Sequence, residues 1–259
     1  MLTVNSNDIV NYAKCPRRFN LYSNLILSGE KKPDDDFLKE KVVSRSIKAL
    51  HTYKYLNNKD MSWEQLRKKT EIIFLELIDG MNYRIFNEFT KYKGILNKVL
   101  NYYSKYYCTT MCFKGIPDVS IRLILDNNLV YDDSVDLVFA VDVDDIRLVD
   151  FKRVYSLEQI KRYSQNVLEH DLDIFIKTYF FWKNTNIKPT EYIRIMLSKV
   201  GIKIFKLKID SDKMLSYESD IKYILTGIKN KNYYPSRSEQ CNYCFFTDKC
   251  GIFIPKPWK

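Results

Sequence analysis

The chain has 259 residues, of which 46% are hydrophobic and 29% are charged, and its formal net charge at pH 7 is +10. This length suffices for one large domain or two small ones. No apolar run approaches the roughly 20 residues of a transmembrane helix, and the amino terminus lacks the pattern of a secretory signal, so we expect a cytoplasmic protein. The positive charge and the 15% aromatic content suit a nucleic-acid partner, although most tyrosines also serve as packing residues.

The first predicted element is a helix over Asp8–Leu21, with Ser6 as its N-cap. The helix contains the string CPRRF, which begins at Cys15. Pro16 lacks a backbone N–H, so it either interrupts this helix or starts a new one, and it fixes Cys15 at a bend. A lone cysteine is usually a small buried side chain. By itself, Cys15 is therefore either a packing residue or a functional thiol.

The next predicted helix covers Phe37–Tyr55. His51 follows Ile47 by four positions, so it borders the buried face of this helix. It is either a hydrogen-bonded core residue or a metal ligand. The other histidine, His170, comes much later in the chain, after the helix predicted to start at Ser156, and it is the weaker candidate for a ligand.

Residues from Ser62 to about Tyr107 are predicted to form a helical lobe. Ser62 and Gln65 match a capping box, and Gly80 and Gly94 mark predicted joints between helices. The lobe mixes lysines and tyrosines, and two interpretations stay open: a channel for DNA, or a solvated surface over a packed aromatic stripe. The residues concerned are Lys91, Tyr92, Lys93, Tyr102, Tyr103, Lys105 and Tyr106.

Four β-strands are predicted next. Val119–Asp126 and Leu129–Asp132 form a hairpin across two asparagines, and it leads into a second pair, Val135–Val143 and Ile146–Lys152. Each run is rich in β-branched and apolar residues. We expect these strands to lie at the centre of a sheet.

The second strand pair carries the candidate catalytic residues. Asp136 lies near the start of its first strand, and Asp150 and Lys152, two apart on its second strand, share a face. Two converging carboxylates form a hard oxygen site that suits Mg²⁺ or Mn²⁺. Such an ion polarises a phosphate and helps to form hydroxide from water, and a neighbouring lysine can act on that water. The alternative is a hairpin with ordinary surface acids.

A further helix is predicted to start at Ser156, with Gln159 as its capping-box partner. Gln159 and Tyr163 are four residues apart, which places both side chains on one helical face. A second helix, over Asp173–Lys183, contains the apolar run FIKTYFFW and is expected to pack against the sheet. The elements predicted after it are strands at Glu191–Leu197 and Gly201–Ile209 and a helix from Ser211 to about Ile228.

Three cysteines lie close together near the carboxyl end, at Cys241, Cys244 and Cys250. Their spacing is typical of a metal site, and Cys15 is the candidate for a fourth ligand. Four thiolates can hold either zinc or an iron–sulfur cluster. The other two cysteines are interpreted as structural residues: Cys108 and Cys112.

The motif formed by Asp136, then Asp150-Phe151-Lys152, then Gln159-x-x-x-Tyr163 resembles the RecB-like branch of the PD-(D/E)XK nuclease superfamily. The resemblance implies an α/β, restriction-endonuclease-like fold with a central mixed sheet flanked by helices. It also implies a role for each residue. The metal ligands would be Asp136, Asp150, the Phe151 carbonyl and His51; the catalytic lysine would be Lys152; and the DNA contacts would be Gln159 and Tyr163.

The four-cysteine set resembles the [4Fe–4S] nucleases of the CRISPR-associated and AddB-like groups. This resemblance implies a structural cluster held by Cys15, Cys241, Cys244 and Cys250, which would join the two ends of a single nuclease domain. The expected segments of that domain are residues 1–60, a helical lobe at 61–113, a nuclease core at 114–210 and a cysteine-bearing end at 211–259.

The expected function is a Mg²⁺- or Mn²⁺-dependent DNA exonuclease that prefers single strands, and recombination or CRISPR-adaptation proteins are the implied partners. No P-loop string occurs in the sequence, so no nucleotide cofactor is expected. Two alternatives remain: a non-catalytic DNA-binding or scaffold protein with the nuclease fold, and a zinc-clipped nuclease that processes RNA.

Overall fold

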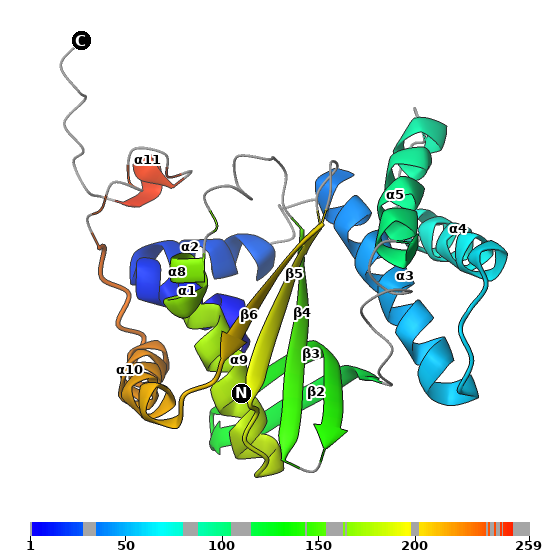
Figure 1. Cartoon of the computed structure of the whole chain (residues 1–259). Coiled ribbons are helices and arrows are strands. Elements are labelled where there is room, and N and C mark those ends of the chain that lie inside the picture. The colour runs from blue at the N-terminus through cyan, green and yellow to red at the C-terminus, as the bar shows by residue number, and fades with distance from the viewer. Residues whose placement is uncertain are drawn as a thin grey trace.

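Figure 1 shows the computed structural model of the chain. The structure describes residues 2–27, 35–79, 88–104, 115–142, 144–153, 163, 165–197, 202–236, 238, 241, 244 and 246–250. Within these residues a six-stranded mixed sheet forms the centre, and helices lie on both of its faces. This architecture confirms the predicted fold class.

The sheet is organised around its third strand. β3 pairs in parallel with β1 at its start, antiparallel with β2 along most of its length, and antiparallel with β4 at its end. β4 then pairs in parallel with β5, and β5 pairs antiparallel with β6. A parallel pair needs a long crossover, and α8 (Gln165–Glu169) and α9 (Leu172–Thr185) lie between β4 and β5 in the chain. The strands are β1 (Leu2–Val4), β2 (Gly115–Asp126), β3 (Leu129–Asp142), β4 (Asp145–Arg153), β5 (Glu191–Leu197) and β6 (Ile202–Lys208).

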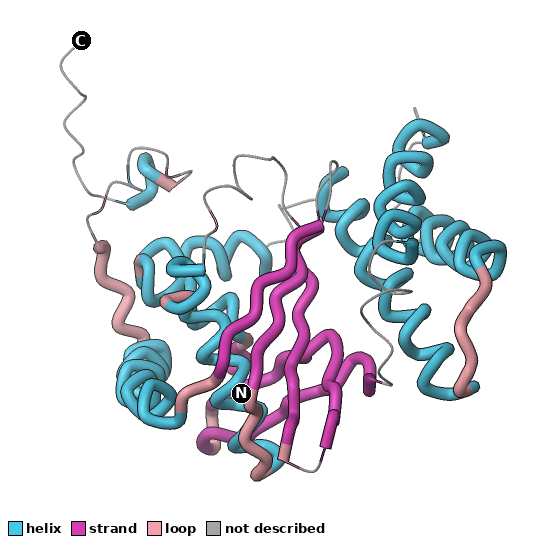
Figure 2. The backbone as a smooth tube through the Cα atoms, in the orientation of Figure 1, coloured by secondary structure: helices cyan, strands magenta, loops and turns pink. Residues whose placement is uncertain are grey.

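One face of the sheet is covered by α9, which packs against β2 and β3. The predicted burial of this helix is confirmed, because Phe175, Phe180 and Phe181 are buried and the Phe180 ring stacks on Tyr131 of β3. The helices α1 (Ser6–Lys14) and α10 (Ser211–Lys229) contact α9, and α2 (Pro16–Leu27) contacts α1. Figure 2 shows this group of helices on one side of the strands.

The opposite face carries the predicted helical lobe. The described helices of the predicted lobe are α4 (Trp63–Asp79) and α5 (Glu88–Tyr102), and they pack together with α3 (Asp35–Asn57), which precedes the predicted lobe. Their core includes sheet residues such as Leu137, Phe139 and Val149.

A last helix, α11 (Thr247–Cys250), lies near the carboxyl end. No helix among the described residues is long and apolar enough to cross a membrane.

The predicted capping box at the start of the lobe is confirmed. The Ser62 N–H donates to Gln65 Oε1 over 2.9 Å, and the Gln65 N–H donates to Ser62 Oγ over 3.3 Å. Two tyrosines at the end of α5 and just after it pack inside the lobe: Tyr102 is fully buried, and the Tyr103 hydroxyl donates to the Met61 carbonyl over 2.9 Å. For these two residues the structure supports the packed stripe, not a channel lining.

Three local predictions were wrong. The strands predicted at Leu129–Asp132 and Val135–Val143 belong to one strand, β3, because the polar residues between them continue to pair with β2. Gly94 lies on the exposed surface within α5, where burial of neighbouring apolar side chains outweighs the ~1 kcal/mol that glycine costs a helix. The N-cap of α1 is Asn5 instead of Ser6, because Asn5 and Asp8 form the capping box. The short strand β1 was not predicted.

Candidate functional site

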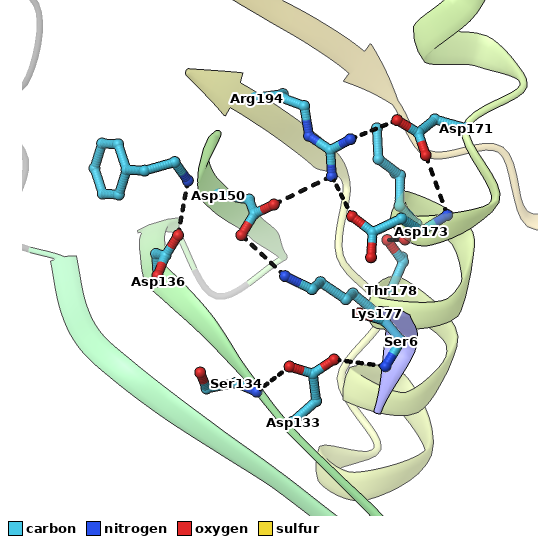
Figure 3. Close-up of polar contacts among 12 residues, drawn as sticks. Ser6, Asp133, Ser134, Asp136, Asp150, Asp171, Asp173, Lys177, Thr178 and Arg194 are labelled. Carbon is cyan, nitrogen blue, oxygen red and sulfur yellow. Dashed lines mark hydrogen bonds and ion pairs between the residues drawn. The ribbon is translucent and has the colours of Figure 1, made fainter. Parts of the chain in front are cut away.

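Asp136 and Asp150 lie side by side on β3 and β4 (Figure 3). Leu137 pairs with Val149, so Asp136 stands opposite Asp150, and both side chains leave the sheet on the face that α9 covers. Asp136 Oδ2 accepts a hydrogen bond from the Phe151 N–H over 2.7 Å, which ties this carboxylate to the neighbouring strand. The side chain of Asp136 is 13% exposed and that of Asp150 is 10% exposed. The structure therefore brings together the two acids that the sequence singled out.

Three cations converge on these acids from three different elements. Lys48 of α3 lies 2.9 Å from Asp136 Oδ1. On the other carboxylate, Lys177 of α9 lies 3.0 Å from Asp150 Oδ1 and Arg194 of β5 lies 3.1 Å from Asp150 Oδ2 (Figure 3). The buried carboxylates are thus compensated within the chain, as buried charges must be.

The two carboxyl groups respond differently to this environment. Burial, and then the charge of Asp150, raises the pKa of Asp136 to about 6. Burial would also raise the pKa of Asp150, but the charges of Lys177 and Arg194 hold it well below its usual range. Two acids that share a buried place and ionise this unequally form a strongly coupled pair, and such pairs are common at catalytic sites.

Arg194 fixes α9 against the sheet. Its side chain is fully buried, and it forms ion pairs with Asp171 and Asp173 as well as with Asp150. Asp171 is also the N-cap of α9, since its side chain accepts the Asp173 N–H over 3.2 Å. This arrangement positions the helix that carries Lys177. Figure 3 shows the arginine between the two helix-start acids and the strand acid.

An open hollow of about 1230 Å³ lies over the two aspartates. Asp150 is buried and Asp136 is half-buried at its floor, whereas the lining side chains of Lys14, Arg45 and Lys152 are exposed. A buried acidic floor below an exposed basic rim suits a phosphate that approaches a cation held by the floor. Lys152, the predicted catalytic lysine, is thus at the hollow and accessible.

His51 is not brought to the carboxylates. Its ring lies near the rings of Phe139 and Phe151, whose side chains point to the opposite face of the sheet from the aspartates. Its Nε2 is 2.8 Å from the Tyr102 hydroxyl, and burial lowers its pKa to about 3. The residue of α3 that reaches Asp136 is Lys48, one turn earlier. The other histidine, His170, lines the hollow.

The predicted DNA-contacting pair is only half visible. Gln159 lies outside the described residues, as do residues 156–162 of the predicted helix. Tyr163 is described and lies outside any helix. Its hydroxyl donates to Asp171 Oδ2 over 2.8 Å and accepts from Arg194 over 3.2 Å, so it belongs to the Arg194 ion-pair network.

The four cysteines of the predicted cluster are all partly exposed. Among the residues that the structure describes, no group of three or more His, Cys, Asp or Glu side chains comes together as a metal site. Residues 12–17, which include Cys15, nevertheless lie beside residues 232–234: the Tyr12 hydroxyl donates to the Asn232 carbonyl over 2.7 Å, and the Arg17 N–H donates to the Tyr234 carbonyl over 3.2 Å. Cys108 and Cys112 lie outside the described residues.

Reasoning from the sequence missed Lys48, Lys177 and Arg194. Two of them gave a visible signal, because each is a single cation within an apolar run: Lys177 in FIKTYFFW and Arg194 in YIRIML. A charged residue in a buried run is informative, since charges are almost never fully buried without a partner. Lys48 gave no such signal.

No protein-family model and no curated protein sequence matches this chain. Solved structures do match it. A candidate exonuclease from Eubacterium rectale aligns with a TM-score of 0.54 and 12% identity, over 99% of this chain and 91% of that chain. An alkaline exonuclease from Laribacter hongkongensis aligns with a TM-score of 0.35 and 9% identity, over 73% of this chain and 87% of that chain. At this identity the first alignment supports the fold alone.

Proposed function

We propose that this protein is a metal-dependent nuclease that hydrolyses single-stranded DNA. The observation that carries the proposal is the facing pair Asp136 and Asp150 on the floor of an open hollow with an exposed basic rim. Action from a strand end is proposed by analogy with the Eubacterium rectale structure of the same fold, which is described as a candidate exonuclease. The aromatic content of the chain, 15%, favours unpaired bases, which stack on aromatic rings.

The residues present fit a divalent metal ion. The two carboxylates are close enough that the charge of Asp150 helps to raise the pKa of Asp136, and a cation between them would relieve that repulsion. Carboxylate oxygens, together with the Phe151 carbonyl as a third oxygen, are the hard ligands that Mg²⁺ and Mn²⁺ take. We assign the ion to Asp136, Asp150 and Phe151 and omit His51, whose ring lies on the other face of the sheet.

A bound ion would polarise the scissile phosphate and favour ionisation of a water molecule. The protein residues then have separate roles. Lys152, exposed at the hollow and two residues beyond Asp150, orients the attacking water and offsets the charge that develops on the phosphate. The water oxygen bonds to phosphorus and releases a proton to solvent, the bond to the leaving sugar oxygen breaks, and that oxygen takes up a proton from solvent. Lys48 and Lys177 hold the two carboxylates in place.

We further propose that Cys15, Cys241, Cys244 and Cys250 hold a structural [4Fe–4S] cluster. Four cysteine thiolates are its usual ligands, and hydrogen bonds to their sulfurs tune such clusters. In support, Cys15 Sγ accepts the Arg18 N–H over 3.4 Å, and Cys241 Sγ accepts the Ser238 N–H over 3.5 Å. The hydrogen bonds of Tyr12 and Arg17 with residues 232 and 234 also hold that later segment beside Cys15.

A non-catalytic DNA-binding role is the second candidate function. It is favoured by the ion pairs of Lys177 and Arg194 with Asp150, which leave that carboxylate compensated without any metal ion. This role predicts DNA binding with no cleavage under any metal condition.

The deciding experiment uses single-stranded DNA labelled at its 5′ or 3′ end, incubated with Mg²⁺ or Mn²⁺, with and without a chelator. We expect metal-dependent shortening from one end, and the labelled end that is retained reports the polarity. Stable binding without any product, in both metals and with iron-loaded protein, would favour the non-catalytic role. Cleavage that persists in chelator would refute the metal-dependent mechanism.

A further inference from the structure

A second hollow adjoins the first along α3. This α3–α4 groove, of about 700 Å³, is lined by one face of α3 and by Lys69 of α4. Arg45 and Lys48 line both hollows, so they form a common border between the groove and the carboxylate site. The α3 face in the groove includes Arg45, Lys48, Tyr53, Leu56 and Asn57.

Lys48 links the two hollows chemically. Its amine lies 2.9 Å from Asp136 in the carboxylate site and 2.6 Å from Asp118 in the groove. The described residues that line the groove include three cations, Arg45, Lys48 and Lys69, against one acid, Asp118, and Arg45 and Lys69 are both exposed. The groove is therefore a positively charged continuation of the site.

The groove also has an apolar component. Tyr53, which lines the groove, is half-buried, and Leu56, farther from Arg45 along α3, is 72% exposed. Cations for phosphates combined with aromatic and apolar surface for bases are the features by which proteins bind single strands. In a duplex the bases are paired and stacked inside, so they cannot contact the surfaces of Tyr53 and Leu56.

The length of the groove fits a short stretch of strand. Arg45 and Asn57 are twelve residues apart on α3 and both line the groove, which corresponds to ~18 Å of helix. At the ~3.4 Å that one stacked nucleotide occupies along its strand, this length holds about five nucleotides, and fewer when the strand is extended.

We propose that the α3–α4 groove is the path of the single-stranded DNA on one side of the scissile phosphate. The strand crosses the border at Arg45 and Lys48 and follows the α3 face toward Lys69. This inference rests on the proposed nuclease function and adds to it a defined strand path of a few nucleotides.

The test measures binding of a fluorescently labelled 12-nucleotide oligo(dT), in chelator so that no cleavage occurs. The groove variant Arg45→Gln/Lys69→Gln is compared with the control Arg67→Gln/Lys68→Gln, which removes the same charges from exposed positions of α4 that do not line the groove. We expect the groove variant to weaken binding about tenfold. Its slope of log affinity against log salt should also shrink by about 1.4, because single strands contribute ~0.7 for each lost phosphate contact.

The control pair should change affinity less than twofold. Equal losses in both pairs would mean that only the general positive charge matters and would overturn the groove assignment, while cleavage by the wild type would leave the nuclease proposal standing. A wild type that neither binds nor cuts single-stranded DNA would refute the nuclease proposal itself. If the groove double variant is not folded by circular dichroism, Lys69→Gln alone carries the test, with an expected slope change of about 0.7.

Discussion

Lys177 of α9 donates a hydrogen bond to Asp150 Oδ1 of β4 over 3.0 Å, across 27 positions of the chain. The lysine side chain is 12% exposed and the aspartate side chain 10% exposed. Burial alone would lower the pKa of Lys177, but the charge of Asp150 raises it well above its ordinary value, so the amine is a cation. The pair joins the crossover helix to the strand that carries the candidate site.

Removing this cation should destabilise the fold. Truncating one partner of a buried ion pair leaves the other charge uncompensated, which costs ~3–5 kcal/mol. Arg194 still pairs with Asp150, so for Lys177→Met we expect a loss at the lower end, about 3 kcal/mol. Urea unfolding in chelator measures it.

The matched control is Lys183→Met on the same helix. Lys183 is more exposed, and its ion pair with Glu218 is long at 3.7 Å, so we expect a loss below ~1 kcal/mol. Equal losses for the two variants would show that the Lys177–Asp150 pair does not form in solution.

Lys152→Ala should separate catalysis from stability. The side chain is exposed at the hollow, so its truncation should leave the free energy of unfolding within ~0.5 kcal/mol of wild type. Loss of a group that acts on the attacking water should lower turnover on single-stranded DNA by about a hundredfold or more, while DNA binding survives.

Asp150→Ala should lower both the turnover and the free energy of unfolding. It removes a proposed metal ligand, and it also leaves Lys177 and Arg194 without their shared partner. Turnover within a few-fold of wild type for either variant would end the assignment of the catalytic site.

His51 should make stability depend on pH. Its pKa falls from 6.5 in the unfolded chain to about 3 in the fold because of burial. The unfolded state therefore takes up a proton between these values that the folded state does not, and stability falls as pH falls through that window. The slope is ~1.4 kcal/mol per pH unit, so the loss between pH 7 and pH 5 is about 2 kcal/mol.

Urea unfolding of wild type and His51→Gln at both pH values checks this expectation. The glutamine keeps a polar group toward Tyr102 and does not titrate, so the variant should lose about 2 kcal/mol less than wild type between pH 7 and pH 5. Identical pH dependence in the two proteins would show that His51 is accessible to protons, contrary to its packing between Tyr102 and Phe151.

Much of the fold was predictable because its signals are local. The capping box at Ser62 and the alternation along β4 depend only on neighbouring residues. The continuity of β3 was not predictable in this way, since its polar residues 132–134 stay in the strand through pairing with β2. The register of a strand depends on its partner strand as well, so the sequence of one strand alone does not determine it.

The residues of the candidate site also differ in whether their positions could be predicted from local sequence. Asp136 and Asp150 could be predicted to meet, because a hairpin places them on facing strands. Lys48, Lys177 and Arg194 come from a distant helix, the crossover helix and the next strand, so their convergence follows from tertiary packing. His51 shows the converse: its position on α3 was correct, but helix rotation turns Lys48 toward Asp136 and His51 toward the aromatic core.

Cys15 provides the test of the proposed cluster. Protein purified without oxygen should be brown and contain about four iron and four sulfide per chain. Cys15→Ala should lose most of this iron, whereas Cys108→Ala, which removes a thiol outside the proposed set, should keep it. Zinc in place of iron in the purified protein would support the zinc-clipped alternative.

The same variant should also lower the melting temperature, for a topological reason. Cys15 and Cys241 are 226 residues apart, since 241 − 15 = 226, and closing a loop of that length costs on the order of 5 kcal/mol in chain entropy. A cluster that links these residues restricts the unfolded chain by up to that amount, and residual structure in the unfolded state reduces the gain. The existing contacts of Tyr12 with Asn232 and of Arg17 with Tyr234 hold these two segments in position for such a link.

Lys152→Ala should change neither iron content nor melting temperature, so it serves as the control. If Cys15→Ala retains full iron and melts with the wild type, Cys15 is a packing residue and no cluster links it to Cys241.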